Sequence, residues 1–446
     1  MKKHRFEIIC LGLIILLGLT PLLWFIPGHL ITGGDLDFPI FPRTRFVERL
    51  FVWNPIIRGG TQEAHNFTTL FFTGVEAFFS YFSKNIITVE KLTFIFWFTL
   101  MGLAILFTID TLFGKKRPVL KISATIFWLF NFYQIYAWEI FRLDEIAALV
   151  ALPPIIALYI KGVGKELTFR KILPWLIPLS FIASSIATNP TVALPLPFAF
   201  AIYLGLALIF KKTTLKFALK FSGLFAGVIL LLNSYWILPF TQKVVSEGLA
   251  DSSAKEEIYQ ADSLLKWTTK NNSFLNIMRS YGDVFLYDGF GGDPYLPFFE
   301  PYKHSRILEA LSFLVPVMAF LGLALSRSSA ALYFGILALF ALWFSKGPHE
   351  PFGNIYLILR EKIPIFWTIR APWQKFSIMT TLSYSILAGL FLEKLYHQLK
   401  SKRKLWLSAL VVTLPLALNI YYLKGFIKGG MFPRPSERKV MPPYHS

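Results

Sequence analysis

The sequence has a single cysteine, Cys10, which excludes an internal disulfide and any metal site built from several cysteines. Acidic residues are also scarce, because 26 Asp and Glu stand against 45 Lys and Arg. Internal repeats and low-complexity linkers are absent, which favours one domain. Apolar residues are abundant instead: 55% of the chain is hydrophobic, and the mean hydropathy is +0.54. We therefore expect an integral membrane protein.

The formal charge of +19 does not indicate a nucleic-acid partner, because the basic residues do not gather in one patch or stripe. They lie instead between apolar segments. A membrane-spanning helix needs ~20 mostly apolar residues, and eleven segments come close to this length. These candidate spans lie near residues 7–27, 92–113, 120–140, 146–160, 172–188, 191–210, 219–240, 307–325, 329–344, 376–393 and 405–423.

The distribution of charge between these spans predicts the orientation. If the N-terminus is inside, the cytoplasmic segments hold 21 Lys and Arg and one acidic residue, Glu166, whereas the outer segments, including a short turn at 141–145, hold 21 Lys and Arg and 20 Asp and Glu. This is the positive-inside pattern, so we expect a multi-pass protein of the cytoplasmic membrane, N-terminus inside and C-terminus outside. The cytoplasmic segments are then 1–6, 114–121, 161–171, 211–220, 326–328 and 394–404.

A further apolar stretch, 67–82, is long enough to suggest a twelfth span, but that span would place the lysines and arginine of 114–121 outside. A helix in the outer interface, with Glu76 toward water, fits better. We expect one transmembrane domain over 1–424 with outer loops 28–90, 241–305 and 345–375. Residues 425–446 form an outer tail, either disordered or the start of a further domain.

The first outer loop opens with candidate acid–base chemistry. Asp35 and Asp37 follow two glycines directly after the first span, and a carboxylate held there could act as a base at the membrane surface. Two solvated loop aspartates are the alternative, because this spacing is common. Arg58 and His65 follow in the same loop, each beside small or polar residues, and they are candidate substrate-binding residues.

These features together resemble a known family. An acidic first outer loop, an interfacial helix behind it and about eleven spans resemble the GT-C superfamily of polyprenyl-phosphate-sugar-dependent glycosyltransferases. Gly34-Asp35, Trp53, Gly60 and the segment 366–376 (Phe-Trp-Thr-Ile-Arg-Ala-Pro-Trp-Gln-Lys-Phe) are similar to the membrane domain of alpha-(1→3)-arabinofuranosyltransferases, and YfhO-type membrane proteins share such features. The likeness covers most of the chain in architecture but only short segments in motif.

The resemblance implies an all-α polytopic, GT-C-like bundle and an inverting sugar transfer. It implies that Asp35 is the base toward an acceptor hydroxyl, with Asp37 as the alternate, because a sugar hydroxyl is a poor nucleophile without a carboxylate to take its proton. Many members carry a second acidic pair in the second outer loop, where Arg142, Asp144 and Glu145 stand here. A cap for the next helix is an equal alternative for these residues.

The leaving group in such a reaction is a lipid phosphate, which needs a cation near the outer membrane surface. Arg370 and Lys375 flank Pro372 just before the tenth span, and they are the candidates. Ordinary interfacial anchoring is the alternative. In the long outer loop, Arg279, Asp288 and Asp293 lie among aromatic residues and glycines, as in a carbohydrate groove or simply a packed loop. The spacing of these aspartates does not match an EF-hand calcium site.

The expected partners are a polyprenyl-phosphate sugar, a glycan or glycolipid acceptor, and membrane lipid. No cofactor is required by the sequence; whether Asp35, Asp37, Asp144 and Glu145 bind a divalent cation stays open. Two other functions are alternatives: a transporter or flippase for lipid-linked sugars or envelope precursors, and a non-catalytic scaffold. Coupled transport favours ionisable residues deep in the spans, whereas Asp110, Glu139, Glu309 and Glu393 all lie near predicted span ends.

Overall fold

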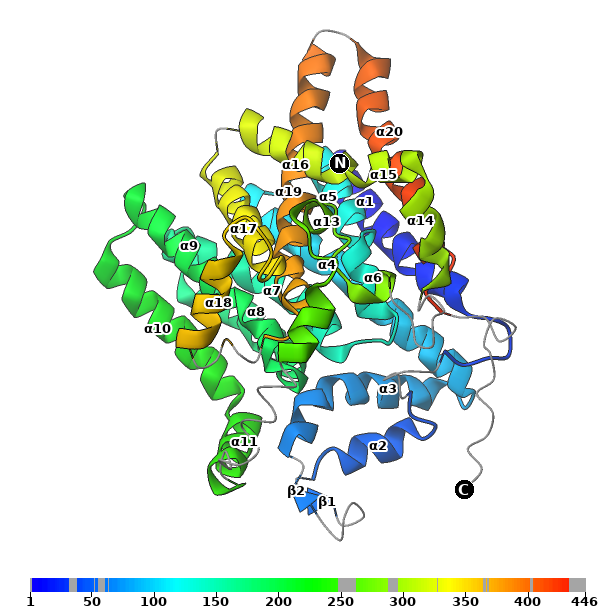
Figure 1. The fold of residues 1–446 in the computed structure, drawn as a ribbon, viewed down its shortest axis with the longest axis vertical. Coiled ribbons are helices and arrows are strands. Elements are labelled where there is room, and N and C mark those ends of the chain that lie inside the picture. Colours follow the sequence, from blue (N-terminus) through cyan, green and yellow to red (C-terminus); the bar gives the residue numbers. More distant parts are fainter. Residues whose placement is uncertain are drawn as a thin grey trace.

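The computed structural model describes residues 2–31, 38–51, 53–54, 61–62, 64–247, 262–287, 296–326, 328–363, 366, 369–401 and 404–432. Apart from one two-stranded antiparallel sheet, the regular structure of this part is helical (Figure 1). The 3-10 helices that matter below are η1 (Thr20–Trp24), η3 (Ala64–Thr69), η4 (Ser185–Thr188) and η5 (Pro190–Ala193). The strands are β1 (Trp53–Asn54) and β2 (Thr61–Gln62).

The α-helices of the first half are α1 (Lys2–Gly18), α2 (Pro42–Glu48), α3 (Leu70–Phe82), α4 (Ile86–Phe113), α5 (Pro118–Leu129), α6 (Phe132–Trp138), α7 (Leu143–Val163), α8 (Phe169–Ser184), α9 (Pro195–Ile209), α10 (Leu215–Leu232) and α11 (Ser234–Glu247). The second half contributes α13 (Phe274–Met278), α14 (Glu300–His304), α15 (Arg306–Ser312), α16 (Leu314–Leu325), α17 (Ser329–Ser345), α18 (Gly353–Lys362), α19 (Pro372–Ser401), α20 (Leu405–Tyr422) and α21 (Lys424–Ile427).

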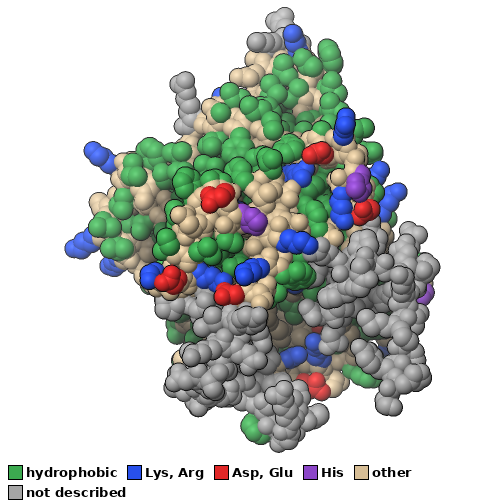
Figure 2. Space-filling model, in the orientation of Figure 1, with side chains coloured by type: hydrophobic (Ala, Val, Ile, Leu, Met, Phe, Trp, Pro, Cys, Tyr) green, Lys and Arg blue, Asp and Glu red, His purple; other side chains and the backbone are tan. Residues whose placement is uncertain are grey.

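Each of the eleven expected spans corresponds to an apolar helix. In the described residues, nine helical segments are long and apolar enough to cross a membrane, and α5 and α17 are shorter apolar helices at the positions of two further spans. The prediction of an all-α polytopic membrane protein is thus confirmed. Hydrophobic side chains cover much of the face shown in Figure 2, and large ones such as Leu231 and Trp406 are over 70% exposed, as lipid contact requires.

The bundle is built around α7 and α19. In the most apolar stretch of each of these two helices, 94% of the residues are buried. The buried share is only 28% for the first span and 17% for α10. Close packing against α19 depends on a glycine in α16, because a Cβ at Gly322 would lie 2.1 Å from the Leu387 carbonyl oxygen. The first turns of α7 and α19, which carry the candidate residues Asp144, Glu145 and Lys375, therefore belong to the two innermost helices.

The segments expected in the cytoplasm meet at one end of the bundle. Arg117 forms an ion pair with Glu393 at 2.5 Å, and Lys212 Nζ donates a hydrogen bond to Ser329 Oγ at 2.6 Å. Lys394 Nζ also donates to the Leu325 carbonyl. These contacts join residues in or beside four of the predicted cytoplasmic segments. The predicted inner segments thus share one side, which we call the inner end.

The helices α2 and α3 lie across the bundle at its opposite end, which we call the outer end, away from the turn between α19 and α20 (Figure 1). The helix expected in the interface is thus present as α3, but its acidic residue is not turned to water: Glu76 is only 6% exposed. The exposed residues of α3 are aromatic, with Tyr81 and Phe82 about 70% exposed. The expectation for Glu76 was wrong because α3 packs the side that carries Phe72 and Glu76 against the bundle and leaves Tyr81 and Phe82 exposed.

The last described segment packs onto the end of the first span. Trp24 of η1 lies with its ring centroid 5.3 Å from that of Phe426 in α21, and Phe426 is fully buried. Gly429, at φ +74°, approaches Trp24 so closely that a Cβ would lie 2.7 Å from the Trp24 Cα. Residues 425–432 of the expected tail are therefore part of the packed bundle, and 433–446 lie outside the described residues.

Candidate functional site

A break in the third expected span brings polar groups to the outer end of the bundle. The apolar run 120–140 is divided at Phe130 and Asn131, where α5 ends and α6 begins, and the Asn131 side chain accepts a hydrogen bond from Gln134 N at 3.1 Å as an N-cap. α7 then starts at Leu143, with Asp144 and Glu145 in its first turn, where the helix dipole favours negative charge.

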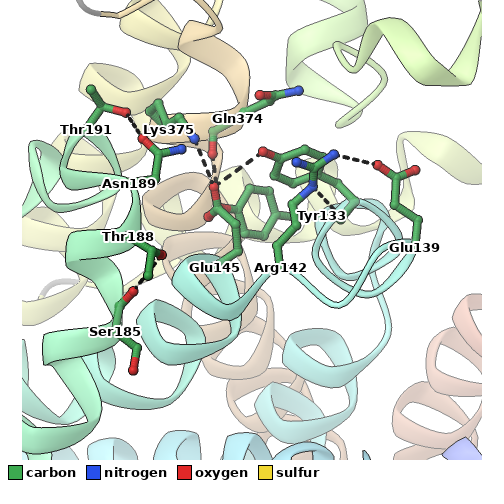
Figure 3. A network of polar contacts seen from close by, with 11 residues as sticks. Tyr133, Glu139, Arg142, Glu145, Ser185, Thr188, Asn189, Thr191, Gln374 and Lys375 are labelled. Atoms are coloured by element: carbon green, nitrogen blue, oxygen red, sulfur yellow. Dashed lines mark hydrogen bonds and ion pairs between the residues drawn. The ribbon is translucent and has the colours of Figure 1, made fainter. Parts of the chain in front are cut away.

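Glu145 is fully buried at the centre of this region (Figure 3). Its Oε1 lies 3.2 Å from Lys375 Nζ, an ion pair in which both side chains are buried. The Tyr133 hydroxyl contacts Glu145 Oε2 and also lies 3.0 Å from the Gln374 carbonyl, so its single proton can be donated to only one of these oxygens. The Tyr136 hydroxyl lies 3.4 Å from Oε1. Glu145 is thus a structural anchor between α6, α7 and α19.

A second ion pair lies beside the first. Arg142 Nη2 donates to Glu139 Oε1 at 2.9 Å, Arg142 Nε donates to the Tyr136 carbonyl at 3.1 Å, and the guanidinium lies 4.2 Å from the Tyr136 ring centroid. The charge of Asp283 also acts on Glu139.

We call Glu139, Arg142, Asp144, Glu145, Asp283 and Lys375 the outer cluster. Asp144 differs from the other carboxylates of the cluster because it is half-buried, and within the described part of the chain it makes no hydrogen bond or ion pair. Its neighbour Glu145 has three partners. Asp144 is therefore the carboxylate of the cluster that can accept a proton from, or bind, an incoming molecule.

Within the first outer loop, the residues on either side of 32–37 are packed. Ile31 N donates to Glu90 Oε2 at 3.1 Å, which ties Ile31 to the first turns of α4. One turn further along α4, Phe94 stacks on Phe141 with ring centroids 4.6 Å apart, and Phe141 directly precedes Arg142 of the outer cluster. Phe38 is buried. The predicted catalytic residues Asp35 and Asp37 themselves lie outside the described residues.

The two cations expected to bind a phosphate have different surroundings. Lys375 is buried against Glu145, whereas the Arg370 side chain is exposed. The backbone of Arg370 is held in place because its carbonyl accepts a hydrogen bond from Thr268 Oγ1 at 2.5 Å. Arg370 thus presents a solvent-accessible guanidinium from a fixed backbone position, five residues before Lys375.

Of the remaining predicted site residues, only Arg279 has a described side chain. Arg279 donates to Asn276 Oδ1 at 2.7 Å, forms an ion pair with Glu309 at 3.4 Å, and lies 4.8 Å from the Tyr281 ring centroid. These contacts join α13 to α15. Arg58, Asp288 and Asp293 lie outside the described residues, as does the side chain of His65 in η3.

Several residues of this region were missed by the sequence reasoning: Tyr133, Tyr136, Asp283, Asn189 and Thr191. The last two belong to the turn around η5, which packs against both α7 and α19; Thr191 Oγ1 donates to Asn189 Oδ1 at 2.6 Å (Figure 3). The usable signal was Asn131 followed by tyrosines inside an otherwise apolar run. Such polar residues in a predicted span indicate a break in the helix.

No group of three or more His, Cys, Asp or Glu side chains in the described residues is arranged to hold a metal ion. The four carboxylates considered as cation ligands are not all among those residues, because Asp35 and Asp37 lie outside them. Glu145 is already occupied by Lys375 and two tyrosines.

An apolar groove of about 580 Å³ lies under α3. Its lining includes Phe46 of α2, Phe71 and Phe78 of α3, Phe96 of α4 and Tyr235 of α11. The wall formed by α3 continues toward the outer cluster, since Phe72 stacks on Trp97 at 3.8 Å and its ring centroid lies 6.1 Å from that of Phe141. An apolar groove and a charged cluster are thus separated by one layer of aromatic side chains.

Neither a family model nor a curated protein matches the chain. Among solved structures, the cryo-EM structure of arabinofuranosyltransferase AftD from mycobacteria is similar over 97% of this chain, with a TM-score of 0.48 and 13% sequence identity. The match covers 27% of the AftD chain, so this protein spans about a quarter of that length. A likeness of this degree carries no weight for function, which must be argued from the residues.

Proposed function

We propose that this protein is a membrane glycosyltransferase that moves a sugar from a polyprenyl-phosphate donor to a glycan or glycolipid acceptor on the outer face of the membrane. The observation that carries the proposal is the outer cluster, where half-buried Asp144 lies beside the buried Glu145–Lys375 pair at the first turns of the two innermost helices. Ile31, which precedes the segment with Asp35 and Asp37, is tied to Glu90 of α4, one turn from the contact between Phe94 and Phe141 beside this cluster.

Asp35 is the proposed general base, with Asp37 as the alternate. The acceptor hydroxyl transfers its proton to the carboxylate as its oxygen forms a bond to the anomeric carbon of the donor. The bond between that carbon and the phosphate oxygen breaks, and the lipid phosphate leaves with the electron pair. Attack from the opposite face inverts the anomeric centre. Asp144, in the first turn of α7, orients the acceptor or the sugar.

The lipid phosphate is assigned to Arg370 rather than Lys375. A guanidinium can bind a phosphate through two parallel charge-assisted hydrogen bonds, and the exposed side chain of Arg370 is available for this contact. Moving Lys375 to a phosphate would leave Glu145 buried without its cation, which is costly. Lys375 therefore has a structural role: its ion pair with Glu145 holds the first turn of α19, five residues after Arg370.

The apolar groove under α3 suits the hydrocarbon chain of the donor. Its volume of about 580 Å³ is typical of a ligand site, and its lining is almost entirely aromatic and aliphatic. A lipid chain in this groove would bring its phosphate toward the aromatic layer around Phe72 and Phe141, next to the outer cluster. The groove thus supports a lipid-linked donor over a soluble sugar nucleotide.

The decisive test is sugar transfer by the purified protein with Asp35→Asn, Asp37→Asn and the double variant, with donor binding measured in parallel. Loss of a general base lowers rates by ~10²- to 10⁴-fold, so Asp35→Asn should lose at least that much while still binding the donor. Glu361→Gln, an exposed carboxylate in α18, is the matched control and should keep full activity. Wild-type rates in the double variant would refute the first-loop site.

A second set of variants tests donor binding by Arg370 and the role of Asp144. Arg370→Ala should weaken donor binding far more than acceptor binding, with Arg370→Lys restoring only part of it, because an ammonium cannot form the bidentate contact. Asp144→Asn should lower the rate without changing donor affinity. Equal donor affinity in the wild type and Arg370→Ala would reduce Arg370 to an interfacial anchor.

Transport of a lipid-linked precursor is the rival function. The acidic residues expected near span ends are all ion-paired: Asp110 with Lys121, Glu139 with Arg142, Glu309 with Arg279 and Glu393 with Arg117. Carboxylates neutralised in this way are poorly suited to carry protons or sodium across the membrane. Lipid movement in protein-containing vesicles without any sugar transfer would favour the rival.

A further inference from the structure

The inner end of the bundle contains a cavity that the proposed reaction does not use. A hollow of about 290 Å³ is lined by Arg117, Lys161, Glu166, Lys212 and the hydroxyls of Ser326, Ser328 and Ser329, among others. It adjoins a wider hollow of about 800 Å³ that shares Arg117 and adds Glu393, Lys394 and His397. We call the two hollows together the inner cavity.

The lining of the inner cavity has an excess of positive charge. Arg117 forms an ion pair with Glu393, and Lys161 forms one with Glu166. The other two described cations have neutral partners, because Lys212 donates to the Ser329 hydroxyl and Lys394 to the Leu325 carbonyl. Four cations thus face two carboxylates, and two positive charges have no compensating anion among the described lining residues.

Helix ends position these charges in an unusual way. α7 and α9 both close with a lysine in the left-handed region that glycine normally occupies: Lys165 at φ 60° and Lys211 at φ 52°. In the tight turns that result, Glu166 N donates a hydrogen bond to the Lys161 carbonyl at 2.9 Å, and Lys212 N donates one to the Ala207 carbonyl at 2.8 Å. The residues that follow, Glu166 and Lys212, thereby line the cavity rather than extend from the helix ends.

We infer that the inner cavity binds a phosphate-bearing anion. Cations contributed by four separate elements, together with three serine hydroxyls, offer both the charge and the hydrogen-bond donors that a phosphate needs. Isolated lysines of the same side, such as Lys216 and Lys220, are exposed and do not line the cavity. The convergence of charges is therefore more than the general excess of positive residues on a cytoplasmic surface.

The headgroup of an anionic phospholipid is the favoured source of the phosphate. Leu112, Phe113, Leu325 and Leu390, at or near the ends of their helices, line the same hollows and give an acyl chain an apolar path beside the headgroup. Basic pockets between transmembrane helices on the cytoplasmic side bind such headgroups in other proteins. A soluble phosphate compound would use the charges but not the apolar lining.

The test compares Lys161→Gln/Lys212→Gln with Lys216→Gln/Lys220→Gln, which removes the same charge from the same side but outside the cavity. Delipidated protein is titrated with phosphatidylglycerol or phosphatidylcholine, and bound lipid is counted by native mass spectrometry. The cavity variant should bind phosphatidylglycerol roughly 30-fold more weakly, at ~1 kcal/mol for each lysine near the surface, and the control should change little. Phosphatidylcholine should bind poorly to all three proteins.

Equal losses in the two double variants, or no preference for phosphatidylglycerol, would overturn the inference. A parallel titration with inorganic phosphate and glycerol phosphate separates the two sources. Saturable binding of these anions that depends on Lys161 and Lys212, without a preference for lipid, would keep the phosphate site but assign it to a soluble ligand. Lys212→Gln alone is the reserve variant, because Lys212 is exposed and bonds only to a serine hydroxyl.

Discussion

The two ends of the bundle have opposite charge compositions. The outer cluster combines four carboxylates with two cations, whereas the inner cavity combines four cations with two carboxylates. The outer carboxylates are Glu139, Asp144, Glu145 and Asp283. The inner cations are Arg117, Lys161, Lys212 and Lys394. An acidic cluster can take up protons and orient hydroxyls, whereas a basic cavity can bind an anion. The same helices, α7 and α19, carry residues of both sites.

The ends also differ in how far their ion pairs are removed from solvent. In the outer Glu145–Lys375 pair the side chains are 0% and 6% exposed, whereas in the inner Lys161–Glu166 pair the glutamate is 56% exposed. A buried charge that loses its partner cannot be solvated, whereas an exposed one can. Equivalent mutations at the two ends should therefore have very different effects.

The largest expected effect is in topology. In a Cys10→Ser background, Lys84→Cys and Lys266→Cys should react with an impermeant thiol reagent added outside intact cells, whereas Lys116→Cys and Lys400→Cys should react only after the membrane is opened. All four positions are exposed, so accessibility to the reagent depends on the side of the membrane alone. Labelling of Lys116→Cys from outside would refute the assignment of the inner and outer ends.

The next largest effect is the loss of the buried outer pair. Lys375→Met should destabilise the protein by ~3–5 kcal/mol, because Glu145 is left buried without its cation. Adding Glu145→Gln should recover much of this loss, since both charges are then gone and Tyr133 can still donate to the amide oxygen. Thermal unfolding in detergent measures both variants; a double variant no more stable than Lys375→Met would contradict the account.

The smallest effect is expected at the inner end. A double-mutant cycle on Lys161 and Glu166 should give a coupling free energy of ~0–1 kcal/mol, because Glu166 is largely solvated and salt screens the pair. The coupling should weaken further at high ionic strength. A coupling as large as that between Glu145 and Lys375 would mean that the two ends do not differ in the way described.

The sequence predicted the helices well because the hydropathy of a span is a local property. All eleven expected segments have helical counterparts, and the joining of predicted inner loops agrees with the charge count. The break between α5 and α6 was missed because Asn131 and Gln134 are isolated polar residues in a mostly apolar run. Its consequence, a cap that turns α6 toward α7, depends on tertiary packing.

The candidate site was less predictable for a related reason. Glu145 and Lys375 were identified individually, but their ion pair joins positions 230 residues apart and could not be read from spacing. Glu76 was expected to face water because glutamate usually does, yet it is buried against the bundle. Pairwise packing, rather than residue type, decides which carboxylates are available for chemistry.

The contact between Trp24 and the last described segment has a consequence for biogenesis. Trp24 enters the membrane with the first span, but its partners Phe426 and Gly429 are among the last described residues to be synthesised. At ~5–20 residues per second, this side of the first helix waits roughly 20 to 80 seconds for its partners. During that interval an exposed indole surface can be shielded by lipid or by an insertion chaperone, so the nascent chain is most vulnerable at its oldest helix.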